Sequence, residues 1–181
     1  MMTDPATLPD RISTLKKDFD DSFAQPSSEG VAAFENLLAI RVAGVRYALR
    51  LRDIRGLHVD RRITRLPSTF GGFLGVISLR GSFLPVYDLR ALMGQATADI
   101  PRWLVVAACA PIALVFDSFD MHLRIAGSVI RTTDESPTKT AGRQAHVEEV
   151  VDIDGAHLPV LELASVCEHI RRHSPSTVAQ S

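Results

Sequence analysis

The most constraining feature of this chain is a pattern that occurs twice, 74 residues apart. Residues 81–92 read Gly-Ser-Phe-Leu-Pro-Val-Tyr-Asp-Leu-Arg-Ala-Leu, and residues 155–166 read Gly-Ala-His-Leu-Pro-Val-Leu-Glu-Leu-Ala-Ser-Val. The shared pattern Gly-x-x-Leu-Pro-Val-x-acid-Leu is too specific to arise from apolar composition alone. Self-similarity at a fixed spacing indicates a repeated structural unit. We therefore expect two related halves, each closing with a strand, a turn, a second strand and a helix.

The first copy has the residues that such a hairpin and helix need. Residues 76–80 and 83–87 have the composition of strands. Gly81, first in a two-residue loop, suits a type II′ turn, because glycine takes positive φ without a Cβ clash. Asp88 can cap the helix that follows and Gly94 can end it. The segment therefore predicts a complete strand–turn–strand–helix unit.

The preceding sequence has the two-residue period of strands. Residues 37–51 alternate on either side of a turn at Ala43-Gly44, which predicts a hairpin with one apolar face and one arginine-rich face. Residues 54–59 and 63–66 continue as further strands. Short strands separated by glycine turns favour all-β modules that close their edges as small barrels.

The second half begins near Trp103, and its nine extra residues fit a surface loop around 132–144. We expect a mainly β protein with one barrel over about 37–94 and a second over about 102–172. Neither half is large enough to bury a sufficient core alone, so the two should share an apolar seam.

The two ends of the chain differ from this β pattern. Residues 1–30 are expected to form an amphipathic helix and a linker, with one apolar face made by Leu8, Ile12, Leu15, Phe19 and Phe23. That face could dock on this protein's own barrel or on another protein. Residues 161–172 predict a final helix, and residues 173–181 a frayed tail.

Charge is segregated along the chain. Residues 41–90 contain ten arginines and three aspartates, whereas residues 1–40 and 91–181 each carry a net charge of -4. The first half therefore offers a basic surface to a partner or to its own acidic flanks.

Other features bear on compartment. Cys109 and Cys167 form no close sequence pair, which fits a reducing compartment and gives no zinc spacing. The longest apolar run, residues 103–116, is 14 residues long, whereas a membrane helix needs about 20. No signal-peptide pattern is visible, so we expect a cytoplasmic protein without membrane insertion.

Catalytic patterns are weak. The six histidines form no His-Glu-x-x-His spacing, and neither Gly-x-Ser-x-Gly nor a Walker-type loop occurs. His169 and His173 are four residues apart on a predicted helix, but at a terminal surface they are more typical of solvated side chains than of metal ligands. We expect no enzyme, no metal and no cofactor. Nucleic-acid binding by the arginine-rich face is the alternative function, although Tyr47 lies on the apolar side and leaves that face without a stacking platform.

The first copy of the repeated pattern, with the residues before it, also resembles the signature of a known family. Gly-Val-Ile-Ser-Leu-Arg-Gly at 75–81, followed by Leu-Pro-Val-Tyr-Asp-Leu-Arg at 84–90, is similar to the signature of CheW-type chemotaxis coupling proteins. The resemblance covers roughly residues 37–170 and is looser in the second half. Ser78 stands where the family usually has Asn, and Gly56 where many members carry Glu.

The resemblance implies a fold and a function. The fold would be two five-stranded, SH3-like barrels packed across a shared seam. The function would be a non-enzymatic adaptor coupling chemoreceptors to a CheA-type histidine kinase in a two-component pathway. The cytoplasmic tip of the receptor would bind between the modules near Arg80, and the kinase regulatory domain would bind the barrel faces. The implied partner-binding residues are Ser78, Leu79, Arg80, Gly81, Ile54 and Arg55.

The residues themselves leave the role of Arg80 open. Its planar guanidinium could hold an acidic or carbonyl group of a partner, or it could pair internally with a carboxylate or carbonyls across the seam, and both could hold at once.

Overall fold

The computed structural model describes residues 34–95, 101–132, 146–153 and 155–173. The predicted N-terminal helix and linker, the tail after His173 and most of the loop predicted at 132–144 lie outside these residues. The strands are β1 (Phe34–Val42), β2 (Val45–Arg50), β3 (Ile54–Val59), β4 (Thr64–Arg65), β5 (Phe73–Leu79), β6 (Ser82–Asp88), β7 (Trp103–Ala107), β8 (Ala113–Phe116), β9 (Ser118–Ala126), β10 (Ile130–Thr132), β11 (Val147–Ile153) and β12 (Ala156–Leu161). The helices are α2 (Leu89–Leu92) and α3 (Leu163–His173), with short 3-10 turns at Leu51–Asp53 and Gly127–Val129.

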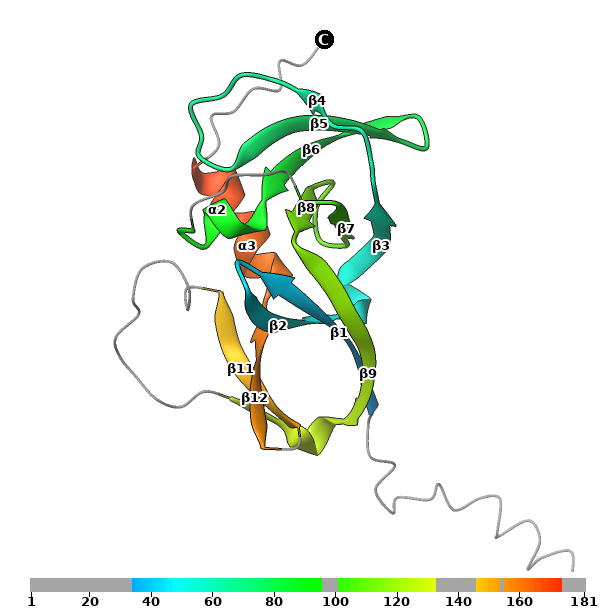
Figure 1. Cartoon of the computed structure of the whole chain (residues 1–181), viewed down its shortest axis with the longest axis vertical. Helices are drawn as coiled ribbons and strands as arrows, with labels where there is room; N and C mark the ends of the chain where they lie inside the picture. The colour runs from blue at the N-terminus through cyan, green and yellow to red at the C-terminus, as the bar shows by residue number, and fades with distance from the viewer. Residues whose placement is uncertain (1–33, 96–100, 133–145, 154, 174–181) are drawn as a thin grey trace, which may run out of the picture. The chain divides into compact units, whose positions relative to one another are not determined.

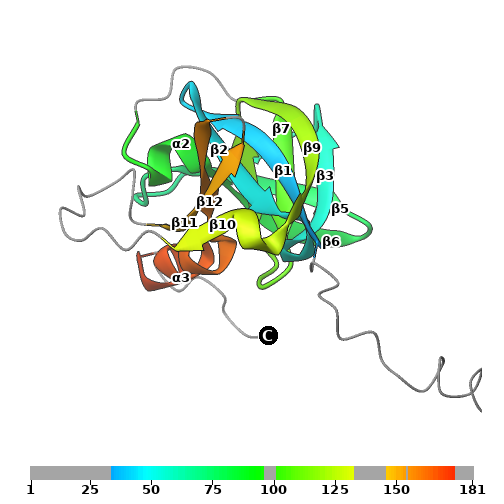
Figure 2. The ribbon, with the colours of Figure 1, turned by 90° about the horizontal axis from the view of Figure 1, so that it is seen from below.

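The strands form two sheets of the same design (Figure 1). Sheet A has the order β10-β11-β12-β2-β1-β9, and sheet B has the order β4-β5-β6-β8-β7-β3. In each sheet the two edge strands are consecutive in the chain, β9 with β10 and β3 with β4, so the sheet curls back on itself (Figure 2). The mainly β, two-barrel prediction is confirmed, with six strands in each sheet rather than five. The sixth is a very short strand, β4 or β10.

The two halves exchange their first hairpins. β1 and β2 of the first half pair with β9 and β12 of the second, whereas β7 and β8 of the second half pair with β3 and β6 of the first. The exchange is reciprocal. β6 pairs in parallel with β8 at Val86↔Ala113, and β12 pairs in parallel with β2 at Val160↔Ala48. Sheet membership therefore differs from the expected division at about residue 94, because each sheet combines strands from both halves.

Three large apolar clusters, with a small fourth one around Cys167, form the core of the described part of the chain. One fills sheet B and includes Ile77, Leu84 and Leu104, and another fills sheet A and includes Leu37, Val151 and Leu158. The third joins side chains of both sheets with α2 and α3, and includes Leu38, Ile40, Tyr47, Leu49, Leu89, Val105, Leu114, Phe116, Leu161 and Val166. This third cluster is the predicted shared seam. Since burial of apolar area is the dominant favourable term in folding, the seam ties the two sheets together.

The hairpin turn differs from the predicted type. β5 ends at Leu79 and β6 begins at Ser82, so the loop is Arg80-Gly81 instead of Gly81-Ser82. Both central residues have positive φ, 50° and 82°, as a type I′ turn requires and a type II′ turn does not. Ala43-Gly44 repeats this geometry between β1 and β2, with φ values of 51° and 78°. Type I′ turns follow the twist of the strands they join, which explains the recurrence.

The helix predictions agree closely with the structure. The Asp88 side chain accepts a hydrogen bond from the Arg90 backbone N–H and caps α2, and Gly94 follows the helix with a φ of 72°. α3 begins two residues after the predicted start. Within the described residues, no helix is both long enough and apolar enough to span a bilayer.

Candidate protein-binding surface

Arg80 occupies an unfavourable backbone conformation at an exposed turn. Its φ of 50° is one that residues other than Gly, Asn and Asp rarely adopt, because Cβ crowds the following carbonyl. The sheet does not need arginine there, since Gly or Asn would form the turn with less strain. Unfavourable conformations of this kind are concentrated at functional sites. The side chain of Arg80 is therefore a candidate for a role outside folding.

Arg80 has no internal partner among the described residues: none of the hydrogen bonds and ion pairs in that part of the chain involves its guanidinium. The internal carboxylate that the sequence left possible is thus not seen. Its charge is nevertheless felt by His58 on β3. The pKa of His58 lies below its ordinary value, first because the imidazole is partly buried, and then because Arg61 and Arg80 repel its proton. The turn and the end of β3 therefore share one electropositive surface.

The segment between β3 and β4 adds further arginines to this surface. Thr64 pairs with Val76 and Arg65 with Gly75, so this segment runs beside β5, the strand that leads into the Arg80 turn. Arg61, Arg62 and Arg65 are exposed, and like Arg80 they form no ion pair within the described residues. We call Arg61, Arg62, Arg65 and Arg80 the arginine surface. Only Arg80 was a predicted site residue; the sequence signal for the others is the arginine-rich run 61–65.

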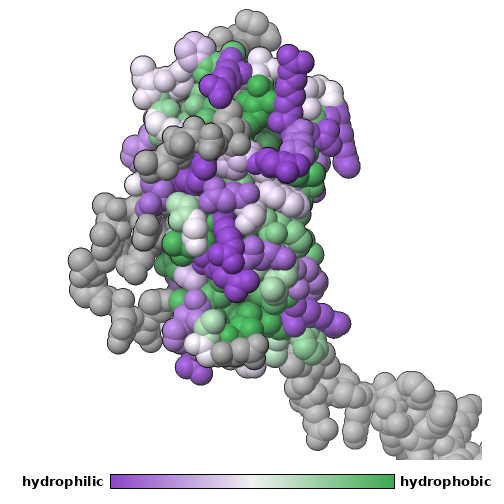
Figure 3. Space-filling model, in the orientation of Figure 1, coloured by the Kyte–Doolittle hydropathy of each residue, from purple (hydrophilic) through white to green (hydrophobic). Residues whose placement is uncertain are grey.

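Apolar side chains are exposed beside the arginine surface. Ser78 pairs directly with Phe83, whose side chain is 76% exposed, and Leu66 after β4 is 45% exposed. Leu79 is half-buried and packs against the core of sheet B. In Figure 3, strongly hydrophilic groups project from the upper part of the molecule, where sheet B lies, with apolar atoms exposed between them. Exposed aromatic and arginine side chains together are typical of protein-binding surfaces.

Ile54 and Arg55 lie at the other end of β3. Ile54 is half-buried and packs against the seam. Arg55 is exposed, and its Nη2 donates to the carbonyl oxygen of Ala108 at 3.4 Å. Arg55 and His58 are three residues apart on one strand, which is about 10 Å. The structure thus brings Ser78, Leu79, Arg80 and Gly81 together, and places the Ile54–Arg55 pair apart from them.

Gly56 lies beneath the ring of His58. A Cβ at Gly56 would come within 2.9 Å of Nε2 of His58. Gly56, at the position where many family members carry glutamate, therefore leaves room for an imidazole over β3. A larger residue at 56 would displace only the end of a side chain.

Most other arginines of the first half are neutralised by the second half. Arg41 and Arg46 both donate to Asp120, at 3.2 Å and 2.8 Å, and the pKa of Asp120 is lowered chiefly by its hydrogen bond from Arg46. Arg90 pairs with Asp117 at 3.2 Å as well as with Asp88. Within the described residues, the arginine surface and Arg55 are thus the part of the basic segment that has no carboxylate partner.

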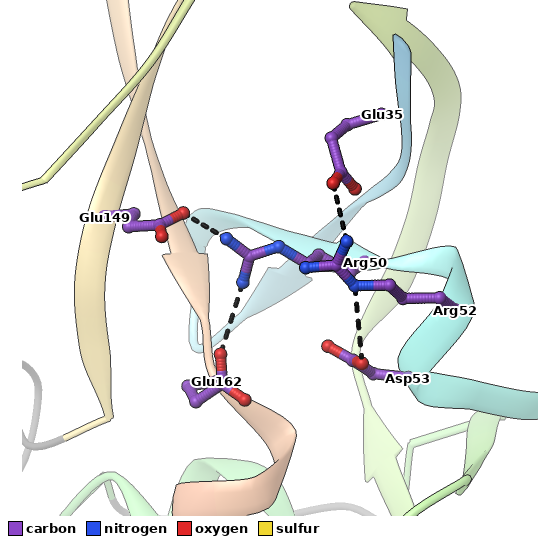
Figure 4. Close-up of polar contacts among 6 residues, drawn as sticks. All are labelled: Glu35, Arg50, Arg52, Asp53, Glu149 and Glu162. Atoms are coloured by element: carbon purple, nitrogen blue, oxygen red, sulfur yellow. Dashed lines mark hydrogen bonds and ion pairs between the residues drawn. The ribbon is translucent and has the colours of Figure 1, made fainter. Parts of the chain in front are cut away.

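Arg50 is the most buried of these arginines (Figure 4). Its guanidinium contacts Glu149 on β11 and Glu162 at the start of α3, so it joins β2 to the second half's hairpin and helix. Nearby, Arg52 contacts Glu35 at 2.6 Å. Because a buried cation that loses its carboxylates is strongly destabilising, Arg50 holds the fold together and is not open to a partner.

Candidate chemistry is sparse in the part of the chain that the structure describes. No three His, Cys, Asp or Glu side chains there converge as ligands for a metal ion. His169 and His173 stack on each other, with ring centres 4.4 Å apart, and His173 Nδ1 contacts the carbonyl oxygen of His169.

Comparison with known proteins agrees with this geometry. The family model described as CheW-like domain matches residues 36–128. The chain is 28% identical over 103 residues to "Probable chemotaxis protein CheW" of Rhizobium etli, covering 55% of this chain and 66% of that protein. It is 25% identical over 134 residues to "Chemotaxis protein CheW" of Rhizobium meliloti, covering 72% and 85%.

A solved structure extends the likeness to the fold. The scaffolding protein TtCheW from Thermoanaerobacter tengcongensis matches with a TM-score of 0.62 at 22% identity, covering 71% of this chain and 88% of that one. At this identity the match concerns the fold alone. The family model, however, spans more than half of the 181-residue chain. The chain therefore belongs to the CheW-like domain family.

Proposed function

We propose that this protein is a non-enzymatic scaffold that couples chemoreceptors to a CheA-type histidine kinase. The observation that carries the proposal is Arg80. It lies in the stretch that resembles the family signature, has an unfavourable φ, is exposed, and has no ion-pair partner in the described part of the chain. A side chain retained at a conformational cost and left without an internal partner fits a contact made with another molecule.

We propose that the arginine surface, with Ser78, Leu79, Gly81 and the exposed Phe83, receives the helical cytoplasmic tip of a receptor. Arginine presents a planar array of donors that matches carboxylates and backbone carbonyls. Phe83 beside it offers apolar area that an amphipathic helix can cover. This role requires a location in the cytoplasm next to the receptor tips.

The second contact is assigned to Ile54 and Arg55 at the far end of β3, for the regulatory domain of the kinase. Both contacts lie on elements of sheet B, which would hold receptor and kinase at a fixed separation. A change in the receptor then alters kinase activity through a coupling free energy, with no bond made or broken in the scaffold.

The two contacts are tested separately. Arg80→Glu should abolish co-sedimentation with receptor-containing membranes and leave binding of the kinase regulatory domain unchanged, whereas Arg55→Glu should do the reverse. Arg172→Glu, at the exposed end of α3, is the matched control and should change neither. Receptor binding that survives Arg80→Glu in a folded protein would overturn the assignment.

Nucleic-acid binding is not favoured by the structure. Arg41, Arg46 and Arg50, on the hairpin proposed for phosphate contact, are all paired with carboxylates. Tyr47 is buried, so it offers no surface for base stacking.

A further inference from the structure

The two cysteines, 58 residues apart in the sequence, lie on two elements that contact each other in the fold. Cys109 is in the turn between β7 and β8, and Cys167 is on α3. Sγ of Cys109 is 3.9 Å from the carbonyl oxygen of Leu163, one helical turn before Cys167. Leu163 and Cys167 are four residues apart on α3 and share one face of it, so Cys109 lies against the face that carries Cys167. Their side chains are thus juxtaposed in the reduced protein.

The two thiols differ in their access to solvent. Cys109 is exposed, whereas Cys167 is 1% exposed and packs with Ala107 at the end of β7 and Ala110 in the turn. Burial, and secondly the neighbouring Cys109, raises the pKa of Cys167 to about 12, so its thiol stays protonated. A dissolved oxidant therefore reaches Cys109 first, and Cys167 can react only with a group brought to it inside the protein.

The turn that carries Cys109 is fixed on its other side. The N–H of Ala108 donates to the carbonyl oxygen of Asp53 at 2.8 Å, and Arg55 donates to the carbonyl oxygen of Ala108 at 3.4 Å. Cys109 is therefore held between β3 and α3. This positioning favours a reaction between the two sulfurs over a reaction with another molecule.

We propose that Cys109 and Cys167 form a reversible disulfide, with hydrogen peroxide as the oxidant. The Cys109 thiolate attacks one peroxide oxygen, the O–O bond breaks, and sulfenic acid and water form after one proton is taken up. The Cys167 sulfur then attacks the Cys109 sulfur, the S–O bond breaks, and the hydroxyl group leaves with the Cys167 proton as water. In sum, two thiols and one peroxide give one disulfide and two waters.

The test is mild oxidation of the folded, full-length chain with hydrogen peroxide, followed by alkylation and mass spectrometry. The expected product is a monomer lighter by two hydrogen atoms, containing a cross-linked peptide pair from Cys109 and Cys167, and restored by dithiothreitol. Oxidation that stops at a Cys109 sulfinic acid, or that yields Cys109-linked dimers instead of the internal cross-link, would overturn the proposal. So would a cross-link that forms only after denaturation.

Two variants test the order of events. In Cys109→Ala, Cys167 should be oxidised about tenfold more slowly than the thiols of the unmodified chain, because its sulfur is buried. In Cys167→Ala, the Cys109 sulfenic acid has no internal partner and should proceed to sulfinic acid or to dimers. Equally fast oxidation of Cys167 in Cys109→Ala would refute the assigned order. Circular dichroism of both variants checks that they are folded.

Discussion

At the residue scale, the backbone conformation of Arg80 predicts that one substitution can raise the stability of the fold and weaken receptor binding. Asn tolerates positive φ better than Arg does, so Arg80→Asn should raise the free energy of unfolding, by up to about 1 kcal/mol. The same change removes the guanidinium and should weaken receptor binding. Urea denaturation and co-sedimentation on the same preparation measure the two effects.

Arg62→Asn is the matched control for this prediction. Arg62 is exposed, and its φ is not positive. Its replacement should change the free energy of unfolding by less than about 0.5 kcal/mol, because it relieves no strain. If Arg80→Asn had a smaller free energy of unfolding than the unmodified chain, Arg80 would have a structural role.

Three histidines predict that the protein loses stability as the pH falls. The pKa values of His58, His146 and His169 all lie below the ordinary value of 6.5, with burial as the first cause in each. Below pH 6.5 the unfolded chain therefore binds protons that the folded chain does not, and the equilibrium shifts toward unfolding. Urea denaturation at pH 7.5 and 5.5 should show a smaller free energy of unfolding at pH 5.5.

His146 is the most buried of the three, and its Nδ1 lies 2.8 Å from the Ser165 hydroxyl oxygen. His146→Asn keeps a polar atom near that hydroxyl but cannot take up a proton. The variant should therefore lose less stability between pH 7.5 and 5.5 than the unmodified chain. An equal or larger loss would show that His146 does not contribute to the pH dependence.

At the scale of elements, two glycines of the β5–β6 hairpin should respond very differently to substitution. A Cβ at Gly81 would meet nothing within 4 Å, so Gly81→Ala should cost only the strain of its positive φ, about 1 kcal/mol. A Cβ at Gly75 would lie 2.0 Å from the carbonyl oxygen of Thr64, which requires β4 to move away from β5. Denaturant unfolding should show a much larger loss for Gly75→Ala; equal losses would contradict the described β4–β5 pairing.

The elements of the fold could largely be predicted from the sequence, but their pairing could not. Alternation of apolar residues and the turn glycines located the hairpins, and the repeat predicted two similar units. The repeat alone does not show whether β2 pairs with β6 of its own half or with β12 of the other half. Either pairing buries the same faces of the strands. The turn was misplaced by one residue because glycine is the expected first residue of a type II′ loop, and only the register Leu79↔Ser82 shows that Arg80 precedes it in the loop.

The candidate surface could be predicted only in part. The signature stretch located Arg80, but the neighbouring arginines depend on how residues 61–65 return along β5. Phe83 could have been found, since Leu84 faces the core and the alternation of a strand places the residue before it outward. Which arginines remain unpaired depends on contacts with acids far away in the sequence, such as Asp120, and no local pattern reveals them.

At the scale of the whole molecule, the exchanged hairpins predict that neither half folds alone. A chain cut between Gln95 and Pro101 gives two fragments, each lacking the hairpin that completes its sheets. Each fragment alone should lack a cooperative unfolding transition, whereas an equimolar mixture should regain it, because the seam cluster draws on both. Circular dichroism during thermal unfolding measures this. Cooperative folding of either fragment alone would contradict the exchange.

The central claim is that one rigid molecule connects two partners through separate surfaces. It is tested most directly by the amount of kinase regulatory domain that co-sediments with receptor-containing membranes as the chain is added. The amount should rise with the added chain, and Arg80→Glu and Arg55→Glu should each prevent the rise, although each variant still binds one partner. A kinase-domain content that does not change when the unmodified chain is added would contradict the claim.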